Sequence, residues 1–415
     1  MFSRRHVLRA GLGLVVSSWL ARSRLALAAP DEAAQTSVAK ARHVIVLWMN
    51  GGPSHIDTWD PKHGKTAGPH KAIKTSVPSL RISEHLPELA RIANKLAVVR
   101  GMTSKEGNHQ RAQYLLHTGY VPNPTVHHPS IGAWVSKRFG EPASGLPAFV
   151  SLNGPSHGGG FFGVQHGPFV VRQAGRIPAD VEAAVDDSRH AARQSLLLDM
   201  ERSFATRTGD PKVEGRRDLY AKADRLMRAS ALEAFDVTRE PESVARAFGD
   251  SPFGKACLTA ARLVSAGVRF VEVTLDGWDT HKDNFARTKK LMGQLDPAMS
   301  SLVVDLERRG RLDDTLIVWM GDFGRSPRIN ADDGRDHHPG AWTAVLAGGG
   351  IRGGVVHGET DDEGARVVKD AVTVPDLFAT VATALGLDPG ETMMSPSGRP
   401  IALTENGRPV KALLR

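Results

Sequence analysis

The stretch HVIVLWMNGGPSHIDTWDPK, residues 43–62, decides the fold class of this chain. Its first seven residues form an apolar run rich in Val, and a polar turn with two glycines and a proline follows directly. Such runs are typical of strands buried on both faces of a parallel sheet. We therefore expect a strand at 43–49 and, at its carboxyl end, either an Asx-type turn or half of a metal site.

Five further apolar runs bounded by Gly, Pro or Asp predict the rest of the sheet, at 96–101, 146–152, 268–275, 315–321 and 342–349. Between the fourth and fifth of these six strands, apolar residues recur at helical spacing: Leu291, Leu295, Met299, Leu302, Val303 and Leu306. Strands that alternate with helices predict an α/β fold with a doubly wound, mostly parallel sheet. Residues 175–250 are charged, rich in Ala and Arg and poor in β-branched residues, which favours a helical insertion.

The N-terminus carries the features of an export signal. A twin-arginine pair at Arg4 and Arg5 precedes a short apolar stretch, and ALA at 26–28 fits a cleavage site. We expect a signal peptide over 1–28, a flexible mature N-terminus over 29–41 and an α/β domain over 42–415. The apolar stretch is too short to span a bilayer comfortably, so we expect a periplasmic or secreted protein without stable membrane insertion.

Charge and cysteine content exclude some classes of function. The formal charge is +8, and five of these charges are arginines of the first 28 residues. No basic stripe with interleaved aromatic residues is present, so we expect no nucleic acid partner. Cys257 is the only cysteine, which excludes an intrachain disulfide and favours a buried, inert thiol.

Carboxylates and imidazoles gather where the predicted strands end. In open parallel sheets, ligands bind beyond the carboxyl ends of the strands, so these loops are expected to converge. Each cluster alone is equally well explained by a turn or a helix cap. Taken together, they predict a divalent metal, zinc or manganese with calcium also possible, because thiolates are absent from the set. The predicted ligands are Asp57, Asp279, His281, Asp322 and His338, with His55 and His337 as alternates.

A further candidate region is EGNHQRAQYLLHTGY, residues 106–120. Asn108 or His109 is expected at the N-terminus of a helix, where free amides favour an anion, and Arg111 lies in the first turn. A capped structural helix with His109 on the surface explains this segment equally well.

Several long motifs resemble an exported bacterial family catalogued as domain of unknown function 1501: VLWMNGGPSHIDTWDPK, GWDTH, TLIVWMGDFGRSP, GRDHHPGAWTAVLAGGGIRGGVVHGETD and VTVPDLFATVATALGLDP. That family is similar to the alkaline-phosphatase-like superfamily of sulfatases and phosphatases. The resemblance implies an alkaline-phosphatase-like fold and hydrolysis of an anionic ester with the help of metal ions. It also implies that Asn50 or Asp57 takes the first acidic place, and that Asp276 or Asp279 pairs with His281.

The sequence departs from that superfamily at two places. Its Asp-His pair is Asp322-Phe323 here, so one ligand of a two-metal site is missing unless His55 replaces it. The position that matches the sulfatase nucleophile is His109, which leaves Thr103, Ser104 or a metal-bound water as the attacking group.

Three hypotheses follow. The first is an exported metal-dependent hydrolase of a phosphate or sulfate ester, acting on a small anionic ester or a sulfated or phosphorylated glycan. In it, Arg325 and Arg111 hold anionic oxygens, His109 and Asn108 belong to the catalytic site, and the insertion and loop 158–169 shape access. The second is a non-catalytic exported binding protein on the same fold. The third is a structural metal that holds the strand-end loops together.

Overall fold

The computed structural model describes residues 41–415 apart from 183, 210 and 211. The predicted signal peptide, 1–28, and all but the last residue of the predicted segment 29–41 lie outside the described residues. Among the residues described, no helix combines the length and the apolar character that crossing a bilayer requires.

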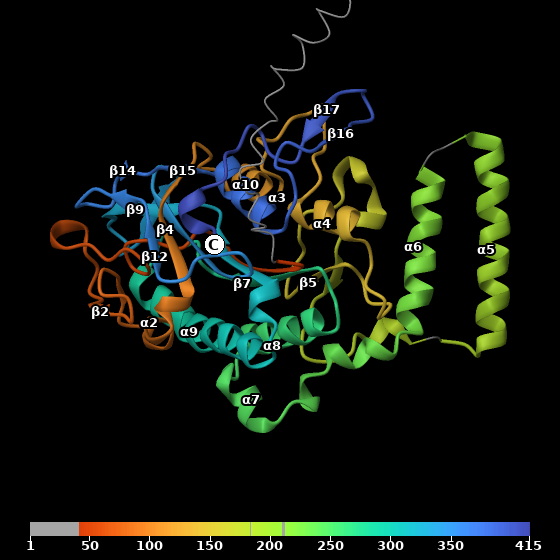
Figure 1. The fold of residues 1–415 in the computed structure, drawn as a ribbon, viewed down its shortest axis with the longest axis horizontal. Helices are drawn as coiled ribbons and strands as arrows, with labels where there is room; N and C mark the ends of the chain where they lie inside the picture. The colour runs from red at the N-terminus through yellow and green to blue at the C-terminus, as the bar shows by residue number, and fades with distance from the viewer. Residues whose placement is uncertain (1–40, 183, 210–211) are drawn as a thin grey trace, which may run out of the picture. The chain divides into compact units, whose positions relative to one another are not determined.

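A nine-stranded sheet forms the centre of the described chain (Figure 1). Across the sheet, the order is β12 (Val355–His357), β4 (Leu96–Thr103), β11 (Trp342–Gly348), β8 (Thr315–Gly321), β1 (His43–Asn50), β7 (Phe270–Asp276), β5 (Phe149–Leu152) and β6 (Phe169–Val171). The short strand β15 (Val372–Thr373) pairs with β4. Each of the six predicted strands is present, and β6, β12 and β15 are additional.

The sheet is mixed but mostly parallel. Strand β1 runs parallel to both of its neighbours, β7 and β8, and the β5–β7 and β5–β6 pairs are also parallel. Strand β11 runs antiparallel to both β8 and β4. The predicted α/β fold with a mostly parallel sheet is therefore confirmed.

Both faces of β1 are covered, which explains its continuous apolar sequence. Ile45, Leu47 and Met49 belong to a core that also contains residues of α8 (Pro252–Ser265) and α9 (Asn284–Arg308). Val44 and Val46 lie on the opposite face, against residues of α4 (Ile131–Phe139) and α10 (Val374–Ala384). Figure 1 shows these two helical layers on either side of the sheet. Burying one such side chain stabilises the fold by about 1.5–3 kcal/mol.

Helices fill the region between β6 and β7. They are α5 (Asp187–Thr208), α6 (Lys212–Met227), α7 (Glu242–Ala247) and α8. Helix α6 contributes Leu226 to the core, whereas α5 leaves Leu196 and Met200 about 62% exposed. Cys257 on α8 is fully buried, as expected, and burial raises the pKa of its thiol.

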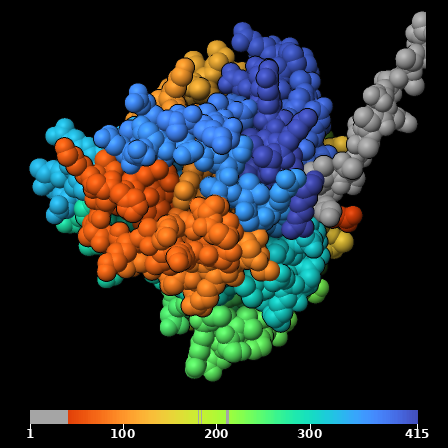
Figure 2. All heavy atoms as spheres, turned by 60° about the vertical axis from the view of Figure 1, so that its left-hand side comes forward, coloured from red at the N-terminus to blue at the C-terminus, as the bar shows by residue number. Residues whose placement is uncertain are grey.

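Four two-stranded sheets and two short helices surround the central sheet. The sheets are β2 (Ala72–Lys74) with β3 (Arg81–Ser83), β9 (Gly324–Ile329) with β10 (Arg335–His338), β13 (Glu359–Thr360) with β14 (Val367–Lys369), and β16 (Thr392–Met394) with β17 (Pro400–Ala402). The helices are α2 (Pro87–Arg91) and α3 (His109–Thr118). Figure 2 shows the orange segment around residues 60–110 beside the blue segment around 340–370 on one face, in agreement with the β12–β4 pairing.

Candidate metal centre at the carboxyl edge of the sheet

The loops after β1, β7 and β8 meet at one edge of the sheet. Asn50, the last residue of β1, is in register with Asp276, the last residue of β7, and Met49 is in register with Gly321 of β8. The Asn50 side-chain amide donates a hydrogen bond to Asp276 Oδ1 at 2.7 Å. The convergence expected from the parallel strand order therefore brings these three loops together.

Asp279 lies at the centre of a group of imidazoles. Its Oδ1 is close to the Nε2 atoms of three histidines: 3.3 Å from His109, 3.2 Å from His281 and 3.4 Å from His337. The Asp279 side chain is 48% exposed, so solvent reaches this carboxylate. The three histidines come from α3, the loop after β7 and β10.

The other ring nitrogen of each histidine is held by an acceptor. His109 Nδ1 is 2.5 Å from Asp322 Oδ2, His281 Nδ1 is 2.9 Å from Asp336 Oδ1, and His337 Nδ1 is 2.7 Å from the carbonyl oxygen of Gly107. Carboxylate and carbonyl oxygens only accept, so each Nδ1 carries the hydrogen and each Nε2 presents a lone pair. This arrangement is typical of histidines that ligate a metal.

The Nε2 atoms of His281 and His337 are only 2.9 Å apart. Two lone pairs at this separation repel unless a cation, either a proton or a metal ion, is shared between them. His109 Nε2 is buried and makes no hydrogen bond within the described part of the chain. The three Nε2 atoms thus leave room for a shared cation between them.

The donor set fits a zinc-class ion. His109, Asp279 and His337 each offer one ligand atom, and these atoms lie within 4.8 Å of one another. Ligands at about 2.0–2.2 Å in tetrahedral geometry are separated from one another by roughly 3.3–3.6 Å. The distances from Asp279 to His109 and His337, 3.3 Å and 3.4 Å, match that separation.

A model of the family described as "Protein of unknown function (DUF1501)" matches residues 41–414. The chain belongs to the DUF1501 family. The resemblance inferred from the sequence motifs is therefore confirmed. No curated protein matches the sequence.

Solved structures similar to this DUF1501 chain include sulfatases and a phosphonate hydrolase. The PsFucS1 sulfatase from Pseudoalteromonas sp. is 15% identical, with 84% of this chain and 68% of that chain covered and a TM-score of 0.41. The phosphonate monoester hydrolase SpPMH from Silicibacter pomeroyi is 12% identical, with 90% and 76% covered and a TM-score of 0.38. A protein in the alkaline phosphatase superfamily from Vibrio parahaemolyticus is 12% identical, with 84% and 67% covered and a TM-score of 0.37.

Helix α3 of the DUF1501 chain places His109 in the cluster. The Asn108 side chain caps the helix by accepting from the Arg111 amide at 3.3 Å, so the helix begins at His109. One turn later, Gln113 Nε2 donates to Asn50 Oδ1 at 2.8 Å and lies 3.5 Å from Asp322 Oδ2. Sequence reasoning missed Gln113, although its spacing of four residues from His109 puts both on one helix face.

Asp322 lies behind His109, on the side of the ring away from Asp279. Its side chain is fully buried, and its Oδ2 accepts from His109. This hydrogen bond raises the pKa of His109, against the opposing effect of partial burial. Phe323 packs its ring against His109 and His337, with centroids 4.9 Å and 4.6 Å away.

Arg325 is committed to the protein itself. Its guanidinium is fully buried, donates to the carbonyl oxygens of Gly51 and Gly52, and donates to Asp279 Oδ1 at 2.6 Å. Burial alone would raise the pKa of Asp279, but the hydrogen bond and charge of Arg325 lower it to about 2. Gly51 has φ of 112°, and a Cβ there would lie 2.3 Å from the Asp279 amide nitrogen, so this close approach requires glycine.

The remaining predicted ligands are not brought to the cluster. Asp57 accepts from Arg335 Nε at 2.7 Å and Nη2 at 3.2 Å, and the two side chains are buried as an ion pair. His55 Nε2 is 2.8 Å from the Gly364 carbonyl oxygen, and burial lowers its pKa to about 4. His338 Nε2 is 2.7 Å from the Ala365 carbonyl oxygen. Sequence spacing could not separate these three from the clustered residues, because each of them also lies near the end of a predicted strand.

Arg111 is also engaged elsewhere. Its Nε and Nη2 donate to the two carboxylate oxygens of Glu106, both at 2.7 Å. The bidentate pair uses the fork geometry that an anionic substrate would need. The structure therefore leaves Arg111, in the first turn of α3, paired with Glu106 of the preceding loop.

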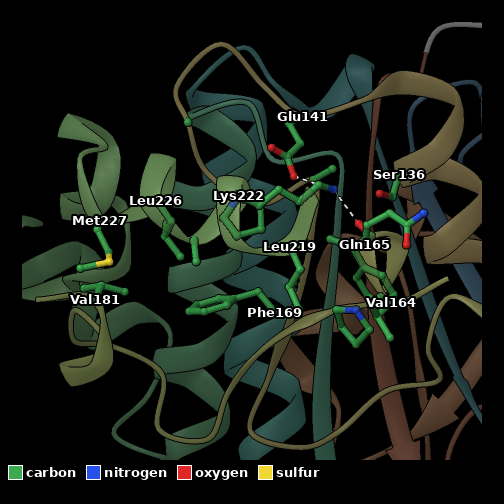
Figure 3. A pocket seen from close by; sticks show the side chains of 17 residues that line it. Ser136, Glu141, Val164, Gln165, Phe169, Val181, Leu219, Lys222, Leu226 and Met227 are labelled. Atoms are coloured by element: carbon green, nitrogen blue, oxygen red, sulfur yellow. Dashed lines mark hydrogen bonds and ion pairs between the residues drawn. The ribbon is translucent and has the colours of Figure 1, made fainter. Parts of the chain in front are cut away.

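An apolar cavity of about 190 Å³ lies apart from the cluster and shares no lining residue with it. Helix α6 and loop 158–169 form it together, so the insertion and the loop contact each other (Figure 3). Lys222 Nζ closes one side, 2.8 Å from Glu141 Oε1 and 2.5 Å from the Gln165 carbonyl oxygen. Phe169 and Leu226 are among its apolar lining residues.

Proposed function

We propose that this protein is a metal-dependent hydrolase of a phosphate or sulfate ester, with a zinc-class ion held by His109, Asp279 and His337. The observation that carries the proposal is the convergence of hydrogen-free Nε2 atoms on Asp279, with the opposite ring nitrogens held by acceptors. Three protein ligands leave a position open, which is the arrangement of catalytic rather than structural zinc.

The ion would polarise the ester and lower the pKa of a bound water, so that water can attack near neutral pH. Asp322 would hold His109 in the ligating tautomer, and the Gly107 carbonyl would do the same for His337. Gln113 and Asn50 form an amide pair beside His109 that would orient substrate oxygens at the rim.

We propose water rather than a side-chain hydroxyl as the attacking group. Ser104 Oγ accepts from the Glu106 amide at 3.1 Å, which holds it in the loop before α3. Thr103 is the last residue of β4, whose partner there is Thr373. Within the described chain, neither hydroxyl is hydrogen-bonded to His109 or Asp279.

The first test is metal content together with turnover. Purified protein reconstituted with zinc or manganese is expected to bind metal and to hydrolyse an aryl phosphate, a phosphodiester or an aryl sulfate. His337→Gln should lose both metal and activity, whereas His63→Gln, at an exposed histidine outside the cluster, should lose neither. Full metal content in His337→Gln would contradict the assignment of ligands.

His109 offers a sharper comparison. If it is a ligand, His109→Gln loses metal and activity together. If Asp279, His281 and His337 hold the ion instead, His109→Gln keeps the metal and loses turnover, and the Asp322–His109 pair then acts on the substrate. Metal content of this variant decides between the two roles.

A non-catalytic exported binding protein is the second candidate. The observation that favours it is that Arg325 and Arg111, the two guanidinium groups expected to hold an anion, are already paired with Asp279 and Glu106. In that case chelation lowers thermal stability, and no ester in the panel is turned over at any metal loading.

We also propose export through the twin-arginine pathway, from Arg4, Arg5 and the apolar stretch that follows. Replacing both arginines with lysine is expected to retain the protein in the cytoplasm. Unchanged periplasmic recovery of that variant would contradict the proposal.

A further inference from the structure

A second group of potential metal ligands lies away from the cluster, at the base of the β2–β3 hairpin. Strand pairing puts Ala72 opposite Ser83, so the residues just outside the hairpin, 70–71 and 84–85, are also adjacent. The Glu84 amide donates to the Lys71 carbonyl at 2.8 Å, and the Lys71 amide donates to Glu84 Oε1 at 2.9 Å. The hairpin therefore fixes the two sides of this group relative to each other.

Two imidazoles face each other at this point. His85 Nε2 lies 3.1 Å from His70 Nδ1, and the rings meet edge to face with centroids 4.4 Å apart. His70 Nε2 lies 3.1 Å from the carbonyl oxygen of Phe285, which only accepts. His70 Nε2 therefore carries the hydrogen, and the lone pair of Nδ1 points at His85.

Glu84 completes a set of three donors. One ligand atom from each of His70, Glu84 and His85 lies within 4.8 Å of the other two, and all three residues are half-buried. Two imidazole nitrogens and one carboxylate oxygen match a zinc site of the His₂Glu type. The 3.1 Å between the two nitrogens is close to the roughly 3.3 Å expected between ligands of a tetrahedral ion.

We propose that His70, Glu84 and His85 form a second site for a zinc-class divalent cation, which holds the two sides of the β2–β3 hairpin together at its base. Phe285 is the second residue of α9, and the loop that carries Asp279 and His281 ends just before that helix. The His70–Phe285 hydrogen bond therefore connects this site to the start of α9. The site stands independently of the hydrolase proposal, because it shares no residue with it.

The test is zinc stoichiometry of the full-length mature protein after chelation and reconstitution with zinc alone. Wild type is expected to bind two ions, His85→Gln one, His337→Gln one, and the double variant none. His63→Gln, an exposed histidine on the loop before this hairpin, is the matched control and should keep both. If the candidate centre at Asp279 binds no metal, wild type and His337→Gln both bind one ion and His85→Gln binds none.

Hydrogen exchange locates the effect. Zinc is expected to slow amide exchange in residues 71–84 of wild type and of His337→Gln, but not of His85→Gln. Should His85→Gln fail to fold by circular dichroism, Glu84→Gln replaces it, with an expected loss of zinc affinity of more than about tenfold at this site. Equal zinc stoichiometry in wild type and His85→Gln would overturn the proposal. So would equal stoichiometry in wild type and a folded Glu84→Gln, together with unchanged amide exchange in the hairpin. Either result would leave a simple His85–His70 hydrogen bond.

Discussion

Asp57 and Asp279 are both aspartates in loops that follow neighbouring strands, yet their surroundings are opposite. Asp57 has a side chain only 1% exposed and accepts from Arg335, from Asn284 at 2.9 Å and from Ser54 at 2.6 Å. Asp279 is 48% exposed, and its Oδ1 faces three imidazole nitrogens and a single arginine. The first carboxylate is saturated with donors, and the second is surrounded mostly by lone pairs.

The comparison shows how a structural carboxylate differs from one suited to a metal. Donors that neutralise Asp57 fix the loop after β1 against β10 and α9, and they leave no lone pair for an ion. The histidines around Asp279 orient their hydrogens outward, towards Asp322, Asp336 and Gly107. Both residues are aspartates, so residue type does not separate their roles. What differs is whether the neighbouring side chains point their hydrogens towards the carboxylate, as at Asp57, or away from it, as the three histidines do at Asp279.

The largest effect on stability is expected at Asp57. Asp57→Ala leaves Arg335 charged and buried without its partner, which should lower the free energy of unfolding by about 3–5 kcal/mol. Urea denaturation measures the loss, and metal content of the folded fraction should be unchanged. A loss below about 1 kcal/mol would show that the pair is not structural.

Asp279→Asn should reverse this pattern. The asparagine oxygen can still accept from Arg325, so we expect only about 1 kcal/mol of destabilisation, but the charge that attracts the ion is gone. Zinc affinity should fall more than about 100-fold, because a first ligand matters at least as much as its supporting residues. Isothermal titration calorimetry of zinc into the variant and into the wild type measures the two affinities. Equal affinities would show that Asp279 is not a ligand.

Proton competition at His109 makes zinc binding at the cluster depend on pH. Because Asp322 raises the pKa of His109, protons compete with zinc at a higher pH than for an ordinary histidine. Zinc affinity should therefore rise from pH 6 through the raised pKa, while Asp279 stays ionised throughout. In the metal-free protein, the free energy of unfolding should change in the opposite direction with pH. The protonated His109–Asp322 pair stabilises the fold at low pH, and this contribution is lost as pH rises through the pKa of His109 in the folded protein.

This dependence is measured by zinc titrations and by urea midpoints of metal-free protein at a series of pH values. His109→Gln is the control variant, and both slopes should flatten in it. A metal-free protein whose midpoint is independent of pH in the wild type and in the variant alike would argue against the His109–Asp322 ion pair.

The smallest effect is expected at Arg111. Its pairing with Glu106 is exposed and outside the cluster, so Arg111→Ala should leave zinc affinity and the urea midpoint within error of wild type. A large fall in turnover with unchanged metal content would instead restore Arg111 as an anion-binding residue.

The sequence predicted the sheet well because six of its strands are buried on both faces and carry long apolar runs. Strand β5 begins at Phe149 rather than at 146, since Pro147 lacks the amide hydrogen that a ladder needs. The antiparallel direction of β11 was not foreseen, because its apolar sequence WTAVLAG is like that of a parallel strand. Direction depends on how the preceding β9–β10 hairpin turns the chain.

The candidate site was predicted in outline but not in detail. Strand-end reasoning selected Asp279, His281 and His337, and helix-start reasoning selected His109. It could not show that Asp322 lies behind His109, or that Arg335 neutralises Asp57, because both facts depend on contacts between residues more than 200 positions apart. Asp336 and Gln113 gained their importance only through the histidine and amide they contact.

The separation of these residues along the chain bears on how the protein is made. His109 and His337 stand side by side, with ring centroids 4.3 Å apart, although 227 residues lie between them. A nascent or truncated polypeptide that stops before β10 lacks His337, one of the three proposed ligands. On the proposed ligand set, only chains completed through residue 337 would carry every donor of the centre.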